Sequence, residues 1–340
     1  MTAPAAPVKS RRPWRKLAVG VSAFLLAPLV PAFRAILPIE QTPLMLIVIV
    51  ASCAIVGWIR GGRFALPLIW VVIAAVLLTS NAGPPEGAYN GMARGWTLMI
   101  AATFGLVSLV ASSEAFFPRA LSALAVSIAL GFGIVLVSQG GTGRVLATMT
   151  GEIDRRVGES NKALRDAVSQ PEWKAMVEGS DRLGRLTKES ELQLAAIPKW
   201  SVMLMPALLA LESLAALAVG WAFYHRMSDV AIGPALGKLK DFRFNDQLVW
   251  GVAVGASVFL LKAFEEGKTA GLNLFVFFGF LYAVRGMGIL AWMSRGRSMR
   301  VMLVVATMLA WYIMAPLAFL IGLGDTWVDW RSRAQQAKQQ

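Results

Sequence analysis

The segment ALLALESLAALAVGW, residues 207–221, is apolar throughout except for Ser213 and one acid, Glu212. It lies within an apolar run of roughly residues 200 to 223, long enough to cross the hydrocarbon core of a bilayer as a helix. A charge at membrane depth costs at least roughly 2.5 to 3.5 kcal/mol on insertion scales, so Glu212 should face protein or a water-filled cavity. The segment therefore predicts a membrane-spanning helix that packs against other helices.

The whole chain repeats this composition. Of 340 residues, 56% are hydrophobic and 16% are charged, and the mean hydropathy is +0.60. Such a chain has more apolar surface than one soluble core needs, which predicts an all-α, polytopic integral membrane helix bundle in a lipid bilayer. Pro28 and Pro31 can bend or shorten the first span, so we expect about eight or nine. The predicted spans are roughly residues 17 to 36, 43 to 59, 64 to 80, 96 to 112, 120 to 139, 200 to 223, 247 to 262, 270 to 293 and 300 to 322.

Four segments follow from this pattern. Residues 1–139 hold about five N-terminal spans, 140–199 form a polar amphipathic helical segment, 200–323 hold about four spans, and 324–340 form an interfacial and polar tail. In the polar segment, an apolar stripe indicates an amphipathic helix. Its basic and acidic residues nearly cancel, so we expect it to pack on itself, on the bilayer surface or on a protein partner. The stripe consists of Val145, Met149, Ile153 and Val157.

The formal charge of +13 is large, but the basic residues lie mostly in short segments between apolar runs. This pattern is typical of loops that face the cytoplasm and anionic headgroups, and it argues against nucleic-acid binding. The segments around Arg60, Arg119 and Arg226 then lie inside, whereas those around Arg34 and Arg94 lie outside. We therefore expect a multi-pass protein with a cytoplasmic N-terminus.

Residue types that carry catalysis are scarce. The chain has one histidine, His225, and one cysteine, Cys53, too few for a zinc site built from histidine and cysteine. The glycine-rich GGTGR at 140–144 lacks the lysine of a phosphate-binding loop and reads as a flexible helix terminus. We predict no catalytic residue, no metal and no cofactor, and hence no enzyme.

Arg285, in FGFLYAVRGMGILAW at residues 278–292, is a second charge at membrane depth. Glu212 and Arg285 could form a bridge that fixes the helices, or they could line a cavity in which Arg285 binds an anionic group and Glu212 a cation or proton. Ala216 and Gly220 continue the Glu212 face with small residues that let another helix approach. Gly251 and Gly255 form a second helix-packing face, which could also support an oligomer.

Two polar stretches flank the last spans. FRFNDQLVW, residues 242–250, offers Asn245 or Asp246 as a helix cap. In GLGDTWVDWRSR, residues 322–333, we expect Gly324 to end the last span, Asp325 to cap a short helix and Asp329 to pair with Arg333. The remaining notable residues are the interfacial aromatics Phe242, Trp250, Trp327 and Trp330, and the basic Arg331.

These stretches carry a family resemblance. FRFNDQLVW, the region of Asn273, Arg285 and Gly286, and the closing Gly324-Asp325 and Asp329-Trp330-Arg331 resemble the YybS-like bacterial membrane proteins, known as domain of unknown function 2232. The resemblance covers mainly residues 200–333, with a looser match over the N-terminal spans. It implies a location in the bacterial inner membrane and a distant similarity to the substrate-binding S-components of energy-coupling factor transporters.

Two functional hypotheses follow. The first is a transport-type subunit that binds a small molecule near Glu212, Arg285 and Asn273. The second is a membrane scaffold or assembly subunit that holds a partner complex through residues 140–199. The extra spans and the polar segment distinguish this chain from a compact six-helix S-component.

Overall fold

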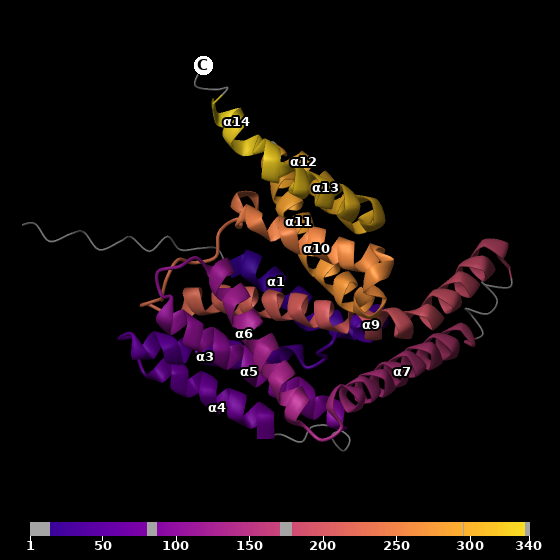
Figure 1. The fold of residues 1–340 in the computed structure, drawn as a ribbon, viewed down its shortest axis with the longest axis horizontal. Coiled ribbons are helices and arrows are strands. Elements are labelled where there is room, and N and C mark those ends of the chain that lie inside the picture. The colour runs from indigo at the N-terminus through magenta and orange to yellow at the C-terminus, as the bar shows by residue number, and fades with distance from the viewer. Residues whose placement is uncertain (1–13, 80–86, 171–178, 295, 337–340) are drawn as a thin grey trace, which may run out of the picture. The chain divides into compact units, whose positions relative to one another are not determined.

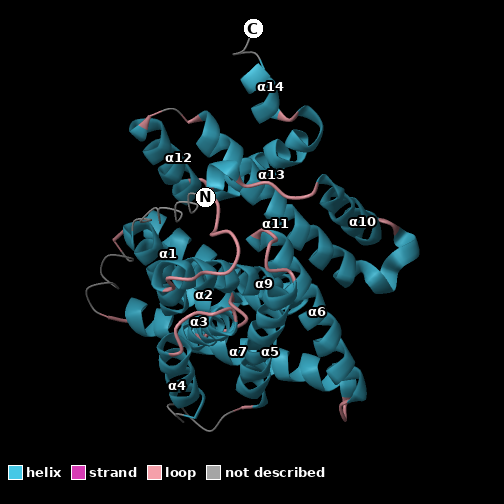
Figure 2. Ribbon diagram, turned by 90° about the vertical axis from the view of Figure 1, so that its left-hand side faces the viewer, coloured by secondary structure: helices cyan, strands magenta, loops and turns pink. Residues whose placement is uncertain are grey.

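The computed structural model describes residues 14–79, 87–170, 179–294 and 296–336. Every regular element in these ranges is an α-helix or a short 3-10 helix, as Figure 2 shows, so the predicted all-α class is confirmed. The chain divides into two compact units, each described by itself below. The N-terminal unit comprises Met1–Pro198 and Glu212–Leu236, and the C-terminal unit comprises Lys199–Leu211 and Gly237–Gln340.

The core of the N-terminal unit is α3, which packs against α4 and α5, and α5 in turn packs against α6 (Figure 1). Because α3 is apolar on all sides, it can bury nearly its whole length between its neighbours. The helices of this unit are α1 (Trp14–Leu26), η1 (Ala27–Leu29), α2 (Pro31–Ile36), α3 (Thr42–Ile59), α4 (Ala65–Thr79), α5 (Ala88–Val110), α6 (Phe116–Val137), α7 (Gly141–Val168) and part of α9 (Asp181–Met227).

The first predicted span is interrupted at its prolines. α1 ends at Leu26, Pro28 lies in the 3-10 turn η1, and Pro31 opens the short helix α2. Proline lacks a backbone N–H and so cannot continue a helix from within, but it is favourable in the first turn. The predicted bend is confirmed.

Within the described ranges, five helices are long and apolar enough to cross a membrane, or six if the bent pair α12 and α13 counts as one span. The count of eight or nine also included the interrupted segment α1–α2 and two helices that are apolar but shorter, Ala65–Thr79 and Asp246–Leu260. The five long candidates are Thr42–Ile59, Ala88–Val110, Phe116–Val137, Trp200–Met227 and Lys262–Met293.

The predicted small-residue face of α9 is confirmed, and its neighbour is α3. Ala216 is fully buried, and a Cβ placed on Gly220 would run into the side chain of Ile49. Without a Cβ at Gly220 the two backbones approach closely. α9 is continuous from Asp181 to Met227, so the boundary drawn at residue 199 lies inside one helix.

The amphipathic prediction for the polar segment is confirmed over α7. Ile153 and Val157 of the predicted stripe are buried, and Val145 and Met149 are half-buried. The helix packs against α2, α5 and α6. Residues 171–178, in the middle of the predicted segment, lie outside the described residues.

In the C-terminal unit α11 is central and packs against both α10 and α13. The predicted packing face of Gly251 and Gly255 lies against α11, because a Cβ on either glycine would overlap Phe278 or the backbone of Phe275. This face is thus covered within the chain itself. The helices of this unit are the rest of α9, η2 (Leu239–Asp241), η3 (Asp246–Leu248), α10 (Val249–Leu260), η4 (Lys262–Gly267), α11 (Lys268–Met293), α12 (Arg297–Leu309), α13 (Trp311–Val328) and α14 (Trp330–Gln336).

α11 and α13 meet through two glycines. A Cβ on Gly286 would overlap the carbonyl group of Ala318, and a Cβ on Gly322 would overlap the carbonyl group of Tyr282. The obstacles are backbone atoms, which cannot move aside as a flexible side chain can. These contacts place α13 close enough for its acidic end to reach Arg285, as described below.

Gly286→Ala is therefore expected to destabilise the protein by about 1–3 kcal/mol, because the added methyl group forces α11 and α13 apart. The matched control is Gly279→Ala on the same helix, whose Cβ would make only ordinary contact with Phe319 at 3.8 Å. Unfolding of the purified proteins in a denaturing detergent series would measure both. Equal stability of the two variants would contradict the close-packing interpretation.

Candidate functional site

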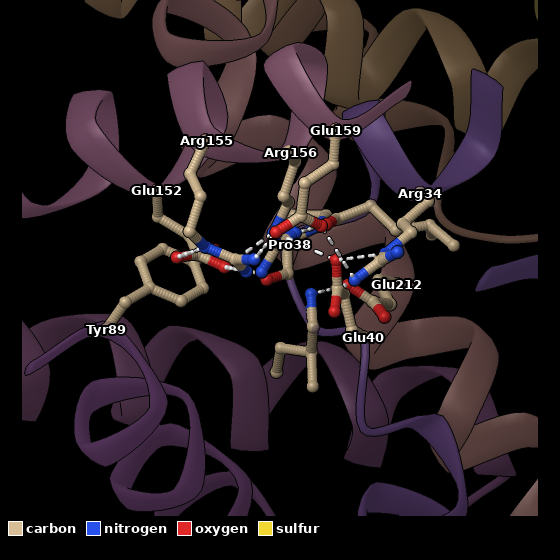
Figure 3. A network of polar contacts seen from close by, with 11 residues as sticks. Arg34, Pro38, Glu40, Tyr89, Glu152, Arg155, Arg156, Glu159 and Glu212 are labelled. Atoms are coloured by element: carbon tan, nitrogen blue, oxygen red, sulfur yellow. Dashed lines mark hydrogen bonds and ion pairs between the residues drawn. The ribbon is translucent and has the colours of Figure 1, made fainter. Parts of the chain in front are cut away.

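Glu212 lies in α9 and is buried, with 6% of its surface exposed. Its Oε2 atom accepts a hydrogen bond of 3.0 Å from the backbone N–H of Ile39, in the segment that joins α2 to α3. Its Oε1 atom is buried and has no hydrogen-bond partner among the described residues. Figure 3 shows the carboxyl group at the edge of a network of charged side chains from α2, α7 and the joining segment.

Arg156 of α7 is the centre of this network. It is 2% exposed and donates from Nη1 to the carbonyl oxygen of Leu37 at 2.8 Å. Its Nε lies 2.8 Å from Glu152 and 3.0 Å from Glu40, and its guanidinium stacks over the ring of Tyr89 at 4.9 Å. A guanidinium can be buried in this way because each of these contacts replaces part of its hydration.

The joining segment is held from further sides. Tyr89 of α5 donates its hydroxyl to the carbonyl oxygen of Pro38 at 2.5 Å. Arg34 of α2 pairs with Glu40 at 2.9 Å and with Glu159 of α7 at 3.4 Å. A non-helical backbone at this depth is tolerated where protein side chains satisfy its polar groups.

The arginines of the network all have carboxylate partners, but one carboxylate has no arginine partner. Arg34, Arg155 and Arg156 pair with Glu40, Glu152 and Glu159. Glu212 is the remaining acid, and in the part of the chain that the structure describes its one hydrogen bond is from the N–H of Ile39. The network therefore holds one more carboxylate than guanidinium, and the excess lies at the buried Glu212.

On the α7 side, Glu152 contacts two arginines, Arg155 and Arg156. Burial by itself would raise the pKa of Glu152, but hydrogen bonds from Arg155 and Arg156 outweigh this and lower it below its usual range. Glu152 thus stays ionised and keeps Arg156 directed at Leu37.

Arg285 forms the centre of a separate cluster in the C-terminal unit. Its Nε and Nη2 atoms donate to the Asp325 carboxylate of α13 at 3.0 and 2.9 Å, and its Nη1 atom donates to Asp246 at 2.5 Å. The Arg285 and Asp325 side chains are 4% and 0% exposed, whereas Asp246 is 57% exposed. All three guanidinium nitrogens are engaged, so this cluster joins α11, α13 and the segment before α10.

Asp325 also contacts the chain that follows it. Its Oδ1 accepts the backbone N–H of Trp330, the first residue of α14, at 3.2 Å, but the residue in the N-cap position of α14 is Asp329, whose side chain accepts the N–H of Ser332. Its Oδ2 lies 3.4 Å from Arg331, which also donates to the carbonyl oxygens of Lys240 and Phe242. The sequence indicates Arg331 only as a family residue. Because its neighbours in the sequence are polar, the sequence gives no sign that its side chain is buried.

Two predictions about this end of the chain are wrong. Gly324 does not end the last span, because α13 continues to Val328 and stops where Asp329 adopts a left-handed conformation with φ 43°. Asp329 pairs with Arg243 and not with Arg333. The Asp329 carboxylate instead accepts the backbone N–H of Ser332 in the first turn of α14, at 3.4 Å, and contacts Arg243 from outside this helix. Hydrogen bonds from Ser332 and Arg243 lower the pKa of Asp329.

Asn273 of α11 inserts its side-chain amide into α9. Its Oδ1 accepts the backbone N–H of Ala207 at 2.9 Å, and its Nδ2 donates to the carbonyl oxygens of Met203 and Thr269, both at 2.8 Å. In a regular helix the backbone N–H of Ala207 would donate to the carbonyl oxygen of Met203, and Pro206 lies between these two residues. Asn273 thus satisfies the backbone where the proline disturbs it.

The remaining predicted residues lie as follows. The Asn245 side chain accepts the N–H of Gln247, which confirms it as the cap of η3. Phe244 packs over the guanidinium of Arg285 at 5.4 Å and contacts both Tyr282 and Phe242. Trp250, Trp327 and Trp330 are exposed, as interfacial aromatic residues are.

Each of the three predicted ligand-binding residues has its hydrogen-bond partners within its own unit. Glu212 belongs to the N-terminal unit, and Arg285 and Asn273 belong to the C-terminal unit. The alternative of a bridge between Glu212 and Arg285 is replaced by these separate contacts. In the described part of the chain, no three His, Cys, Asp or Glu side chains are placed to hold a metal ion.

One groove in the N-terminal unit has a volume of about 440 Å³ and lies between α3 and α5. Its lining is almost wholly apolar, and Ser52, which it includes, donates its hydroxyl to Ala101. None of the predicted ligand-binding residues lines it, and its surface suits hydrocarbon.

Asp325→Asn is expected to destabilise the protein by about 3–5 kcal/mol, because it leaves the buried Arg285 without its main counter-charge. Asp329→Asn removes an exposed pair and should cost less than about 1 kcal/mol. Denaturant unfolding of both variants is the measurement. Similar losses for the two aspartates would contradict the buried ion pair.

The lowered pKa of Glu152 predicts an acid-sensitive attachment of α7. A carboxyl whose folded-state pKa is depressed stabilises the fold above its unfolded-state pKa, and that stability is lost as the pH falls through the folded value. The wild type should therefore lose stability below about pH 4.5, the ordinary value for this carboxyl.

Glu152→Gln should show a smaller acid-dependent loss, whereas Asp154→Asn, on the exposed face of α7, should behave like the wild type. Hydrogen exchange of α7 against pH would measure this, and identical profiles for Glu152→Gln and the wild type would refute it.

The comparisons with known proteins agree with the helical architecture. The family model described as a predicted membrane protein, DUF2232, matches residues 42–326. No curated protein and no solved structure matches the chain. Because the matched region spans most of the sequence and includes the long apolar helices, the chain belongs to the DUF2232 family of multi-pass membrane proteins.

Proposed function

We propose that the protein is a non-enzymatic, transport-type membrane subunit that binds a small molecule through a cationic group, with Glu212 as the residue that binds it. We place it in the bacterial cytoplasmic membrane with its N-terminus inside. The proposal keeps the expected distant similarity to S-components, which bind a substrate but do not transform it.

The observation that carries the proposal is the unpaired buried carboxyl of Glu212. A buried carboxylate without a counter-charge is costly, so a proton or a cation should accompany it. Its Oε1 has no hydrogen-bond partner, and the neighbouring arginines are already bound to other acids. One carboxyl group offers too few ligands for a divalent metal, which favours a monovalent organic cation.

Arg285 and Asn273 have a different role in this proposal. All three nitrogens of the Arg285 guanidinium and both polar atoms of the Asn273 amide have partners in the C-terminal unit. A ligand would have to displace these partners. Both residues therefore serve to hold α9, α11 and α13 together, and Glu212 is the member of the predicted set that remains open to a ligand.

The alternative of a scaffold subunit rests on α7. The helix is 28 residues long, and Asp154, Arg155 and Glu159 lie on its exposed face. Mixed charges on a long helix suit a protein partner. Purification from native membranes with identification of bound proteins would favour this alternative if an unrelated complex co-purifies, and transport if an ATPase and a coupling membrane subunit co-purify.

Glu212→Gln tests the preferred function. Glutamine keeps an acceptor for the Ile39 N–H but removes the charge, so the variant should fold and be at least as thermally stable as the wild type. Stabilisation of the wild type by methylammonium, guanidinium or choline, or by a cation recovered from native membranes, should disappear in the variant.

The matched control is Glu159→Gln, which removes a carboxylate that is 47% exposed and paired with Arg34 and Arg155. It should keep the cation-dependent stabilisation. If the wild type and Glu212→Gln are stabilised equally by the same cation, Glu212 does not bind it.

A further inference from the structure

Arg119 in the first turns of α6 is a fully buried cation. Its Nε atom lies 3.4 Å from the carbonyl oxygen of Ala115, to which it donates. Its Nη1 and Nη2 atoms are buried and have no hydrogen-bond partner. Among the described residues, no carboxylate forms an ion pair with it, so most donors of the guanidinium lack an acceptor.

The aromatic surroundings hold the guanidinium but do not satisfy it. Arg119 stacks over the ring of Trp221 at 4.5 Å, and Trp221 itself packs against Phe104 and Phe116. A cation–π contact uses the flat face of the guanidinium, whereas its N–H groups point outward in its plane. The edge with Nη1 and Nη2 is thus fixed in position and free to donate.

The same place carries the positive end of a helix. α6 begins at Phe116, and its N-cap residue, Ala115, makes no side-chain capping hydrogen bond. The helix has 22 residues, so its first backbone N–H groups add positive potential beside the Arg119 side chain. The nearest acid in sequence, Glu114, is exposed and forms no ion pair with Arg119 in the described structure.

The cover over the guanidinium is thin. Gly233, in the loop that follows α9, is exposed and has φ 63°. A Cβ on Gly233 would meet the Nη2 atom of Arg119. This donor therefore lies directly against an exposed glycine, and a displacement of the loop at Gly233 would open a path to it.

We propose that the Nη1 and Nη2 edge of Arg119 binds a phosphate oxyanion, carried by a lipid headgroup or by a free phosphate compound. Two parallel N–H donors match two phosphate oxygens, and arginine makes this bidentate contact better than any other side chain. The site lies where α6 begins and α9 ends, at the end of apolar helices where headgroups are found. It uses no residue of the Glu212 network and does not depend on the cation proposed there.

The test uses the full-length protein purified in detergent and stripped of lipid. Inorganic phosphate, with chloride at equal ionic strength as the control, is titrated by thermal shift, and short-chain phosphatidylglycerol is added for native mass spectrometry. We expect one of the two probes to bind the wild type, and Arg119→Gln to weaken that binding by at least about tenfold, as expected for loss of hydrogen bonds to a charged group.

Gly233→Ala is a second variant, and it keeps the arginine. Its methyl group and the unfavourable φ disturb the loop that covers the guanidinium, so the affinity for the probe should also change. Arg63→Gln is the matched control. Arg63 follows the C-terminal end of α3 and is also basic, but its side chain is 86% exposed. Binding of phosphate alone assigns a free phosphate compound, and binding of phosphatidylglycerol alone assigns a lipid. The proposal is overturned if neither probe binds the wild type, or if Arg119→Gln and Arg63→Gln bind as the wild type does.

Discussion

A charged side chain that is buried away from water needs a counter-charge close to it. In the C-terminal unit the pair of Arg285 with Asp325 meets this constraint. Both side chains are almost completely buried, and every nitrogen of the guanidinium has an acceptor. The pair fixes which residues of α11 and α13 face one another, and the glycines at the same interface let the backbones come close enough for it to form. The two polar stretches, residues 242–250 and 322–333, thus meet at one buried guanidinium.

The N-terminal unit meets the same constraint only in part. Arg156 is buried with several acceptors around it, whereas Glu212 has one backbone N–H and Arg119 has one carbonyl group. These two residues have opposite charge and lie in different surroundings, the first beside the segment that joins α2 to α3 and the second beneath the loop after α9. A fold that leaves a buried acid and a buried base incompletely paired is more easily explained by occupants of each site than by stability.

Local patterns in the sequence predicted much of this arrangement. Apolar runs predicted the helical class, the stripe around Ile153 predicted α7, and the Asn245 cap and the glycine faces followed from short motifs. The partners of the buried charges could not be predicted, because they are distant in sequence or have no side-chain signature. Glu212 binds a backbone N–H 173 positions away, and Arg285 binds an aspartate 40 positions away. Asp329 was misassigned because its left-handed conformation cannot be read from a non-glycine residue.

The insertion of Asn273 between Met203 and Ala207 has a consequence for synthesis of the protein. During translation α9 emerges before α11, so the backbone groups on either side of Pro206 are made before Asn273, the side chain that contacts them in the folded protein. The part of α9 around Pro206 should therefore remain near water, the insertion machinery or a chaperone until α11 enters the bilayer. Asn273 thus makes the integration of α9 dependent on a helix that the ribosome has yet to make.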